Sequence, residues 1–434
     1  MNSFFASVEL LDYPELRDVP VAVAGNPEQR HGIILAKNEA AKKFGVVTAE
    51  TIQQALRKCP NLKFLPPHHD KYSHYSKLLN EIYRSYTDLV EPFSIDESWL
   101  DVTGSEKLFG TAEHIADEIR QRVRETYGLT LSVGVSYNKI FAKMGSEYKK
   151  PDATTVITEE NYRELLWPQP VEDFFYVGHA TAEKMRKIHI YTIGELAQAD
   201  PKFLKRTFGS HGEDLHRYAN GWDDSPVRRW GDWEDVKSVG HGVTFRRNLR
   251  GRDDVAQAVT ELSDWVSSRL RLYEMKAYGV KVEITTPNFR RVSKQRRYER
   301  SFVTAQQIRR AAMELVEEMR FMNQEIRLLT ITAIHLVRSD APEQLSIFDL
   351  VVSDADESTS GKNTKRLSNN SDEANDGNNA SCVADDPIQS AKTAKQEEKI
   401  ERTMDQIREK FGNSSIGFAH TIGNDLGLEN RKKK

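Results

Sequence analysis

The pattern of hydrophobic and polar positions predicts a mixed α/β domain at the beginning of the chain. Short apolar runs bounded by turn residues are typical of strands, and apolar residues three and four apart are typical of helices. By these criteria residues 72–88 and 139–150 form helices. The predicted strands include 19–25, 32–36 and 130–138.

Residues 237–338 show a second pattern. Strand-like runs alternate with two helical stripes, and Thr304 with Gln307 forms a capping box at the start of the second helix. The predicted strands are 237–245, 279–286, 294–302 and 326–337. The order is β-α-β-β-α-β, which predicts one sheet with an open face.

The stretch between these two regions is helical in pattern. Residues 176–200 predict a helix, a glycine turn and a second helix, similar to a helix-hairpin-helix that binds a DNA phosphate through backbone N–H groups. Ala180 stands where a second glycine is usual. An ordinary helical connector explains these residues nearly as well.

The chain changes character after residue 350. Residues 351–391 are rich in Ser, Asn, Asp and Gly, which predicts a disordered linker. Residues 395–411 are a predicted helix that ends at Gly412. Its apolar stripe should pack on this protein or on a partner, and consists of Ile400, Met404, Ile407 and Phe411.

Composition indicates a cytoplasmic protein. The chain of 434 residues is long enough for two to four domains. Its two cysteines, Cys59 and Cys382, are far apart, which argues against a disulfide scaffold and fits a reducing compartment. We find no apolar run that could span a bilayer and no signal-peptide pattern. We therefore expect no membrane contact.

The net charge of −3 hides a strong asymmetry along the chain. Residues 237–310 contain 17 Lys and Arg against 7 Asp and Glu, a net charge of +10. Residues 351–391 contain 3 against 8, a net charge of −5. Ten excess positive charges in one compact segment favour binding to a polyanion over an ordinary solvated surface.

The most informative short motif is FSIDESWLDVTG, in which Asp96 and Glu97 are adjacent between apolar flanks. Neighbours on a straight strand point to opposite faces, so both carboxylates can serve one site only at a turn or a bulge. A polar hairpin turn would also explain the pair. Burying two acids is costly without a cation, and Mg²⁺ held by carboxylates and substrate phosphates would compensate them.

Five motifs in order carry a family resemblance: MNSFFASVE, AKNEAAKKFGV, FSIDESWLDVTG, SVGVSYNKIFAKMGSEYKKPDATTVI and VGHATAEKM. Together they closely resemble the Y-family, translesion DNA polymerases of the DNA polymerase IV type. The resemblance runs from residue 1 to about residue 350.

The resemblance implies an α+β multidomain fold. A right-hand polymerase of palm, fingers and thumb precedes a βαββαβ little finger and a disordered tail. The implied domains are the palm (1–11 and 69–165), the fingers (12–68), the thumb with its helix-hairpin-helix-like element (166–231) and the little finger (237–338). The implied partners are primer–template DNA and deoxynucleoside triphosphates, and we expect a monomer.

The resemblance also implies catalysis by nucleotidyl transfer with two Mg²⁺ ions. Asp96 and Glu97 match the metal-binding carboxylates of the second motif, and the backbone carbonyl of Met1 matches a further ligand. The family usually has a third metal-binding Asp immediately before the residue that matches Met1. For the chain that begins at Met1 we therefore expect very poor primer extension. If the DNA upstream of the Met1 codon encodes, in frame, an apolar strand ending in Asp, then Met1 is a misplaced start.

Substrate-binding residues follow from the same motifs. Phe5 matches the steric gate, a ring that leaves no room for a 2′-hydroxyl, whereas Phe4 is expected in the core. Lys42 and Lys150 match residues that contact the incoming triphosphate. Glu39 stands where many members have a triphosphate-binding Tyr, and since its charge should repel phosphate we assign it no role.

The basic region at 237–338 matches the little finger, which holds DNA through phosphate contacts that do not read sequence. Binding of this kind weakens steeply with salt. The candidate DNA-binding residues are Arg246, Arg247, Arg250, Arg290, Arg291, Arg296 and Arg297.

Residues 344–348, QLSIF, resemble the short peptide that binds the bacterial sliding clamp. Gln344 provides a polar contact, and Leu345, Ile347 and Phe348 provide apolar anchors. An ordinary edge strand is the alternative. The position between a folded domain and the predicted linker favours the clamp-binding peptide.

The sequence as a whole predicts template-directed, low-fidelity DNA synthesis past damaged bases. One alternative is a catalytically impaired protein that binds DNA and the sliding clamp. A weaker alternative is a different Mg²⁺-dependent phosphoryl-transfer enzyme with a palm-like sheet.

Overall fold

The computed structural model describes residues 1–26, 32–232, 234–342, 387–413, 415–417 and 425–428, and of residues 387–395 only the helical backbone. The chain divides into two units, Met1–Glu234 and Asp235–Lys433. The division lies just before the predicted start of the little finger. Residues 344–348 and most of the predicted linker lie outside the described residues.

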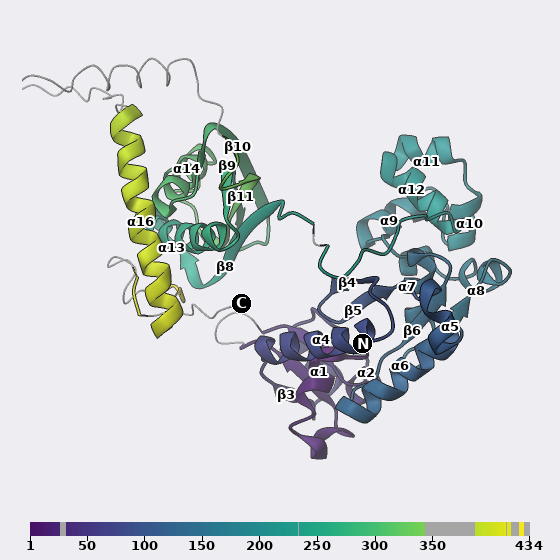
Figure 1. Ribbon diagram of the computed structural model, residues 1–434. Coiled ribbons are helices and arrows are strands. Elements are labelled where there is room, and N and C mark those ends of the chain that lie inside the picture. Colours follow the sequence, from purple (N-terminus) through teal and green to yellow (C-terminus); the bar gives the residue numbers. More distant parts are fainter. Residues whose placement is uncertain (27–31, 233, 343–386, 414, 418–424, 429–434) are drawn as a thin grey trace, which may run out of the picture. The chain divides into compact units, whose positions relative to one another are not determined.

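Unit 1, the part from Met1 to Glu234, is built around short sheets (Figure 1). Its strands are β1 (Val21–Ala24), β2 (Ile34–Lys37), β3 (Lys63–Leu65), β4 (Val90–Ser94), β5 (Glu97–Leu100), β6 (Val133–Ser136) and β7 (Thr154–Ile157). In the described residues they form a β2-β1-β3 sheet, a β4-β5 hairpin and a parallel β6-β7 pair. The strands predicted at 19–25, 32–36 and 130–138 are confirmed.

The helices of unit 1 surround these sheets and supply most of its core. They are α1 (Phe4–Glu9), α2 (Glu39–Lys42), α3 (Ile52–Lys58), α4 (His69–Arg84), α5 (Glu106–Phe109), α6 (Ala112–Tyr127), α7 (Lys139–Tyr148), α8 (Tyr162–Leu166), α9 (His179–Lys187), α10 (Ile193–Gln198), α11 (Pro201–Phe208) and α12 (Ser210–Ala219). Separate hydrophobic clusters lie under α4 and α6, between α2 and α3, and among α7 to α12. The assignment of palm, fingers and thumb within unit 1 remains a prediction.

Unit 2, from Asp235 on, has the predicted β-α-β-β-α-β order. Its elements are β8 (Ser238–Leu249), α13 (Gly251–Leu272), β9 (Met275–Thr285), β10 (Arg291–Phe302), α14 (Ala305–Glu318), β11 (Ile326–Arg338) and a further helix α16 (Pro387–Phe411). The strands form one antiparallel sheet in the order β10-β9-β11-β8. The predicted capping box of Thr304 and Gln307 is present at the start of α14.

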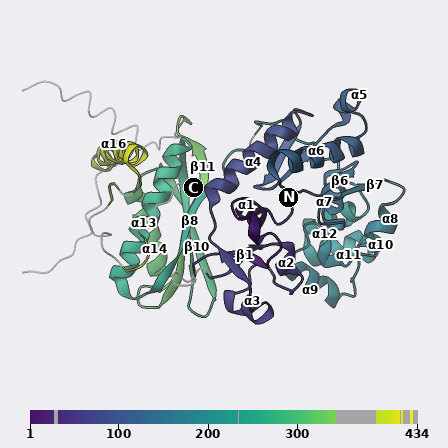
Figure 2. The ribbon, with the colours of Figure 1, turned by 90° about the horizontal axis from the view of Figure 1, so that it is seen from below.

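Helices α13 and α14 cover one face of this sheet, and the core lies between (Figure 2). Alternate residues of the strands, such as Val282 and Ile331, are buried under the helices. Their neighbours Lys281 and Thr332 are paired on the opposite face. That face is polar, as the sequence pattern predicted.

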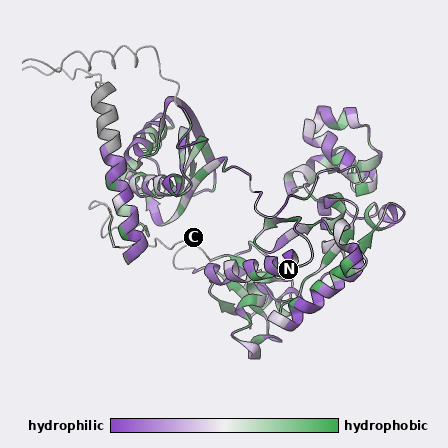
Figure 3. Cartoon of the chain, in the orientation of Figure 1, coloured by the Kyte–Doolittle hydropathy of each residue, from purple (hydrophilic) through white to green (hydrophobic). Residues whose placement is uncertain are grey.

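Helix α16 packs on α13, on the side away from the sheet (Figures 1 and 2). It begins at Pro387, inside the predicted linker 351–391 and earlier than the predicted position 395. Figure 3 shows that its described part is mostly hydrophilic. The predicted apolar stripe is only partly buried, because Ile400 and Phe411 are 55% and 67% exposed.

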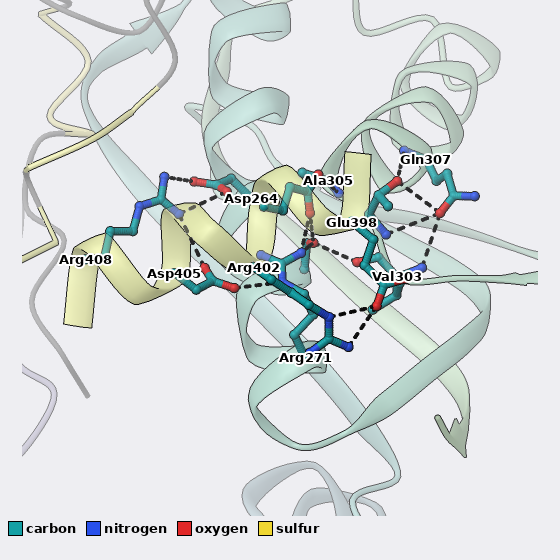
Figure 4. A network of polar contacts seen from close by, with 12 residues as sticks. Asp264, Arg271, Val303, Ala305, Gln307, Glu398, Arg402, Asp405 and Arg408 are labelled. Atoms are coloured by element: carbon teal, nitrogen blue, oxygen red, sulfur yellow. Dashed lines mark hydrogen bonds and ion pairs between the residues drawn. The ribbon is translucent and has the colours of Figure 1, made fainter. Parts of the chain in front are cut away.

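The buried face of α16 consists instead of charged residues around Met404 (Figure 4). Arg408 forms a bidentate pair with Asp264 of α13, at 2.8 and 3.2 Å. Arg271 of α13 bonds Glu401, and its Nε donates to Asp405 at 2.7 Å. The same Glu401 accepts hydrogen bonds from Ser267 and from the backbone N–H of Ala305, the first residue of α14.

Candidate active site

Asp96 and Glu97 lie at the end of the β4-β5 hairpin. Ser94 pairs with Glu97, so Ile95 and Asp96 form a two-residue turn. The predicted turn is therefore present, and it breaks the alternation that would separate the two carboxylates. Asp96 accepts a hydrogen bond from Ser94 Oγ at 3.0 Å. The amino group of Met1 donates to the backbone carbonyl of Asp96 at 3.0 Å, which places Met1 beside the turn.

The hairpin end opens into a cavity of about 420 Å³. Met1, Asp96 and Glu97 line it together with three lysines: Lys143, Lys150 and Lys139, of which Lys139 is paired with Glu91. Four of the predicted site residues are thus brought together although they are up to 149 positions apart. Lys143 was not singled out in the sequence, where it is one lysine of an amphipathic helix.

The cations and carboxylates of this cavity form a chain of ion pairs. Lys143 Nζ lies 2.5 Å from Glu97 and 2.8 Å from Glu147, and Lys150 Nζ lies 2.6 Å from Glu147. Burial lowers the pKa of Lys143, but the hydrogen bonds that Lys143 donates to Glu147 and Glu97, together with their negative charge, outweigh burial and leave that pKa raised. The spacing of four and three residues from Glu147 would have revealed this chain in the sequence.

A close helix–strand contact positions Lys143. Gly134 of β6 faces α7, and a Cβ on Gly134 would lie 1.9 Å from the carbonyl oxygen of Ala142. No side chain fits in that space, so only glycine lets α7 approach β6 this closely. At its start, α7 is capped by Asn138, whose side chain accepts from the backbone N–H of Phe141.

Phe4 and Phe5 have different environments at the start of α1. Phe4 is 4% exposed and belongs to the core under α4, as predicted. Phe5 is partly buried, and its ring stacks on Tyr72 with centroids 3.9 Å apart and planes 11° apart. His69 packs edge-on against Phe5. Phe5 is held as a fixed flat ring, although it is not among the residues that line the cavity.

Lys42 and Glu39 are paired on α2. Lys42 Nζ lies 2.5 Å from Glu39, which also accepts a hydrogen bond from Ser3 Oγ at 3.2 Å. This ion pair offsets the negative charge of Glu39. Ser3 precedes α1, so this contact places Lys42 near the helix that carries Phe5, but outside the cavity lining.

Comparison with known proteins decides the family. Residues 1–147 match the model of the impB/mucB/samB family, and residues 236–347 match the model of its C-terminal domain. DNA polymerase IV of Acetivibrio thermocellus is 43% identical over 348 residues, which is 80% of this chain and 87% of that protein. This chain is a Y-family DNA polymerase of the DNA polymerase IV type. The family consists of DNA-directed DNA polymerases.

Other relatives extend this likeness over nearly the whole polymerase. DNA polymerase IV of Clostridium kluyveri is 34% identical over 416 residues, which is 96% of this chain and 95% of that protein. Among solved structures, a Y-family DNA polymerase chimera of Dbh and Dpo4 matches with a TM-score of 0.69 and 21% identity. The match covers 78% of this chain and 97% of the chimera, and it confirms the multidomain polymerase fold.

The seven candidate arginines of the polymerase differ in environment. Three already pair with carboxylates: Arg247 with Asp254 and Asp425, Arg250 with Glu325, and Arg296 with Glu318 and Glu314. By register Arg296 lies on the helix-covered face, whereas Arg291 and Arg297 lie on the open face. The remaining exposed arginines are Arg246 and Arg290.

The donor set at the hairpin is suited to Mg²⁺. Asp96 and Glu97 offer hard carboxylate oxygens at one turn, and Mg²⁺ in polymerase sites is typically held by one or two carboxylates plus substrate phosphates. In the described part of the chain, no group of three or more His, Cys, Asp or Glu side chains forms a closed metal cage. The residues present fit an ion that is completed by substrate.

In the described residues, no helix is long and apolar enough to cross a membrane. Cys59 is a free, buried cysteine. Cys382 lies outside the described residues.

Proposed function

We propose that this polymerase carries out template-directed, low-fidelity DNA synthesis past damaged bases, in the cytoplasm, with two Mg²⁺ ions. The observation that carries the proposal is the hairpin turn that places Asp96 and Glu97 in one cavity with Lys143 and Lys150. Family membership supplies the reaction class, and the cavity supplies carboxylates and cations that suit a nucleoside triphosphate.

In this proposal the two carboxylates hold the metal, together with the backbone carbonyl of Met1. When bound, Mg²⁺ would stabilise negative charge on the triphosphate and favour ionisation of the primer 3′-hydroxyl. Lys150 and Lys42 bind the triphosphate oxygens as compact cations, after releasing Glu147 and Glu39. Lys143 pairs with Glu97 until the metal binds.

Phe5 selects the sugar in this proposal. Its ring is fixed by stacking on Tyr72, so it cannot move away from an additional hydroxyl without losing that contact. Phe5→Ala should raise incorporation of ribonucleotides relative to deoxyribonucleotides. Phe4 is unsuited to this role because it is buried. Unchanged sugar selectivity in Phe5→Ala would contradict the proposed role of Phe5 as the steric gate.

Primer extension tests the proposed activity. Templates with and without an abasic site are copied in the presence of Mg²⁺, and EDTA should abolish extension. Extension that stops at every damaged base would contradict translesion synthesis. DNA binding without any extension would instead support the impaired DNA- and clamp-binding alternative.

We also propose that a monomeric polymerase binds the sliding clamp through Gln344, Leu345, Ile347 and Phe348. Changing Leu345, Ile347 and Phe348 together to Ala should abolish stimulation of primer extension by the clamp and leave basal extension unchanged. Loss of both activities would contradict a separate docking peptide.

A further inference from the structure

The turn between β9 and β10 has a phenylalanine where glycine or asparagine is favoured. Phe289 has a φ of 61°, in the left-handed region that crowds a side chain. The turn is closed by the Phe289 N–H bonding the carbonyl of Thr286 at 2.9 Å and by the Thr286 N–H bonding Arg290 at 3.0 Å. These hydrogen bonds involve only backbone atoms, so the turn does not require an aromatic side chain at position 289.

The ring of Phe289 is not used in packing the core. It is 70% exposed, and it belongs to none of the hydrophobic clusters of the described residues. The guanidinium of Arg327 lies over the ring, 4.8 Å from its centroid. A flat guanidinium on the ring supports it in one orientation and leaves much of the aromatic surface open to solvent.

The surroundings of Phe289 are positively charged. Arg290 and Arg291 follow it directly, and both are exposed. Thr285 pairs with Arg291 of β10 and with Leu328 of β11, so the turn and the Arg327 region lie at the same end of the sheet. An exposed ring between arginines is suited to a ligand with a π-face and phosphates close together.

We propose that Phe289 is a stacking platform for an unpaired base of single-stranded DNA, with Arg290 and Arg291 binding the adjacent phosphates. This inference rests on the proposed function, in which the template has an unpaired stretch. Single-stranded DNA fits the observations better than a duplex, because each base inside a duplex is already stacked on both sides. An unpaired base has a free π-face that any aromatic ring can cover.

The test uses the full chain and two DNA probes, a primer–template with a single-stranded overhang and a blunt duplex of the same length. Phe289→Gly should weaken binding to the overhang probe by about tenfold and leave binding to the blunt duplex unchanged. The same variant should raise the melting temperature, because glycine relieves the left-handed backbone. Lost affinity then cannot be ascribed to misfolding. Phe289→Trp should retain overhang binding.

The salt dependence of DNA affinity distinguishes the contribution of base stacking from that of phosphate contacts. Stacking involves no counterion, so Phe289→Gly should leave the slope of log affinity against log salt unchanged. Arg291→Ala should reduce the magnitude of that slope by about 0.7 to 0.9. A structural disturbance of the turn would alter both the slope and the affinity.

Three results would overturn the proposal: unchanged overhang binding in Phe289→Gly, an equal loss on the blunt duplex, or loss of overhang binding in Phe289→Trp. A parent chain that binds neither DNA probe would refute the proposed function instead. Parent-like overhang binding in Phe289→Gly with a reduced slope in Arg291→Ala would refute the platform alone.

Discussion

Each unit contains a network of ion pairs in which lysine or arginine side chains alternate with carboxylates. The two networks differ in how deeply their side chains are buried. The cavity network of Glu97, Lys143, Glu147 and Lys150 retains between 15 and 47% side-chain exposure. The helix network described above, which joins α16 to α13, contains pairs with between 1 and 8% exposure. Water and ligands can replace partners in the first network, whereas the buried pairs of the second are closed off from water.

Two glutamates show the consequence of this difference. Burial raises the pKa of Glu147, but bonds from Lys143 and Lys150 outweigh it, and the pKa is lowered. Burial also raises the pKa of Glu401, and there Arg271 does not outweigh it. The cavity network is thus ready to exchange a cation, and the helix network is suited to holding one arrangement.

The largest expected effect is on catalysis. In a form that carries the upstream strand and its Asp, Asp96→Asn should reduce primer extension by about a thousandfold, because a metal contributes several kcal/mol of transition-state stabilisation and 1.36 kcal/mol is tenfold in rate. Binding of primer–template DNA should remain. The measurement is single-turnover extension beside Glu113→Gln, an exposed carboxylate on α6, which should behave as the parent. A parent-like rate in Asp96→Asn would show that Asp96 does not hold a catalytic metal ion.

The second effect is on the helix network. Arg408→Met removes the bidentate ion pair that Arg408 forms with the buried Asp264 and should destabilise the packing of α16 by up to about 3–5 kcal/mol. Hydrogen exchange of α16 amides reports this directly. Combining Arg408→Met with Asp264→Leu should recover most of the loss, since two apolar side chains require no partner. Equal hydrogen-exchange rates in the parent, the single variant and the double variant would show that the Arg408–Asp264 pair does not stabilise the packing of α16.

The third effect is a pH dependence of α16. The pKa of Glu401 is raised above 4.5, so the folded state binds its proton in a window where the unfolded state has lost it. Stability from this group is therefore present at low pH and is lost as pH rises through the folded pKa, by at most about 1.4 kcal/mol per pH unit. Protection of α16, corrected for intrinsic exchange, should decrease with pH more in the parent than in Glu401→Gln. Identical profiles would contradict this assignment.

The smallest effect concerns Lys143. Lys143→Met releases Glu97, and a partly exposed ion pair is worth about 1 kcal/mol or less. Half-saturation by Mg²⁺ should then occur at a concentration about two- to fivefold lower. A titration of primer extension with Mg²⁺ measures this. A higher Mg²⁺ requirement would mean that Lys143 supports the site instead of competing with the ion.

The sequence predicted features that depend on local pattern. The βαββαβ order, the capping box at Thr304 and the turn at Asp96 follow from spacing and turn chemistry, and all three are confirmed. The roles of Phe5, Lys42, Lys150 and the arginines remain predictions.

What the sequence did not predict depends on contacts between distant residues. The stripe of α16 predicted an apolar contact face, but the face is charged because α13 presents Asp264 and Arg271 as complementary partners. Arg296 is a candidate for DNA by charge alone, yet register turns it toward Glu318. The periodicity of one segment does not show which residues of other segments will pack against it.

The packing of α16 also has a mechanical consequence. β11 ends at Arg338 and α16 begins at Pro387, and both belong to unit 2. The described elements that precede and follow the proposed clamp-binding residues 344–348 therefore belong to one unit. If a clamp bound this peptide and moved along DNA, the force on the peptide would reach unit 2 through β11 on one side and α16 on the other. The buried ion pairs of α16 would then resist part of that force.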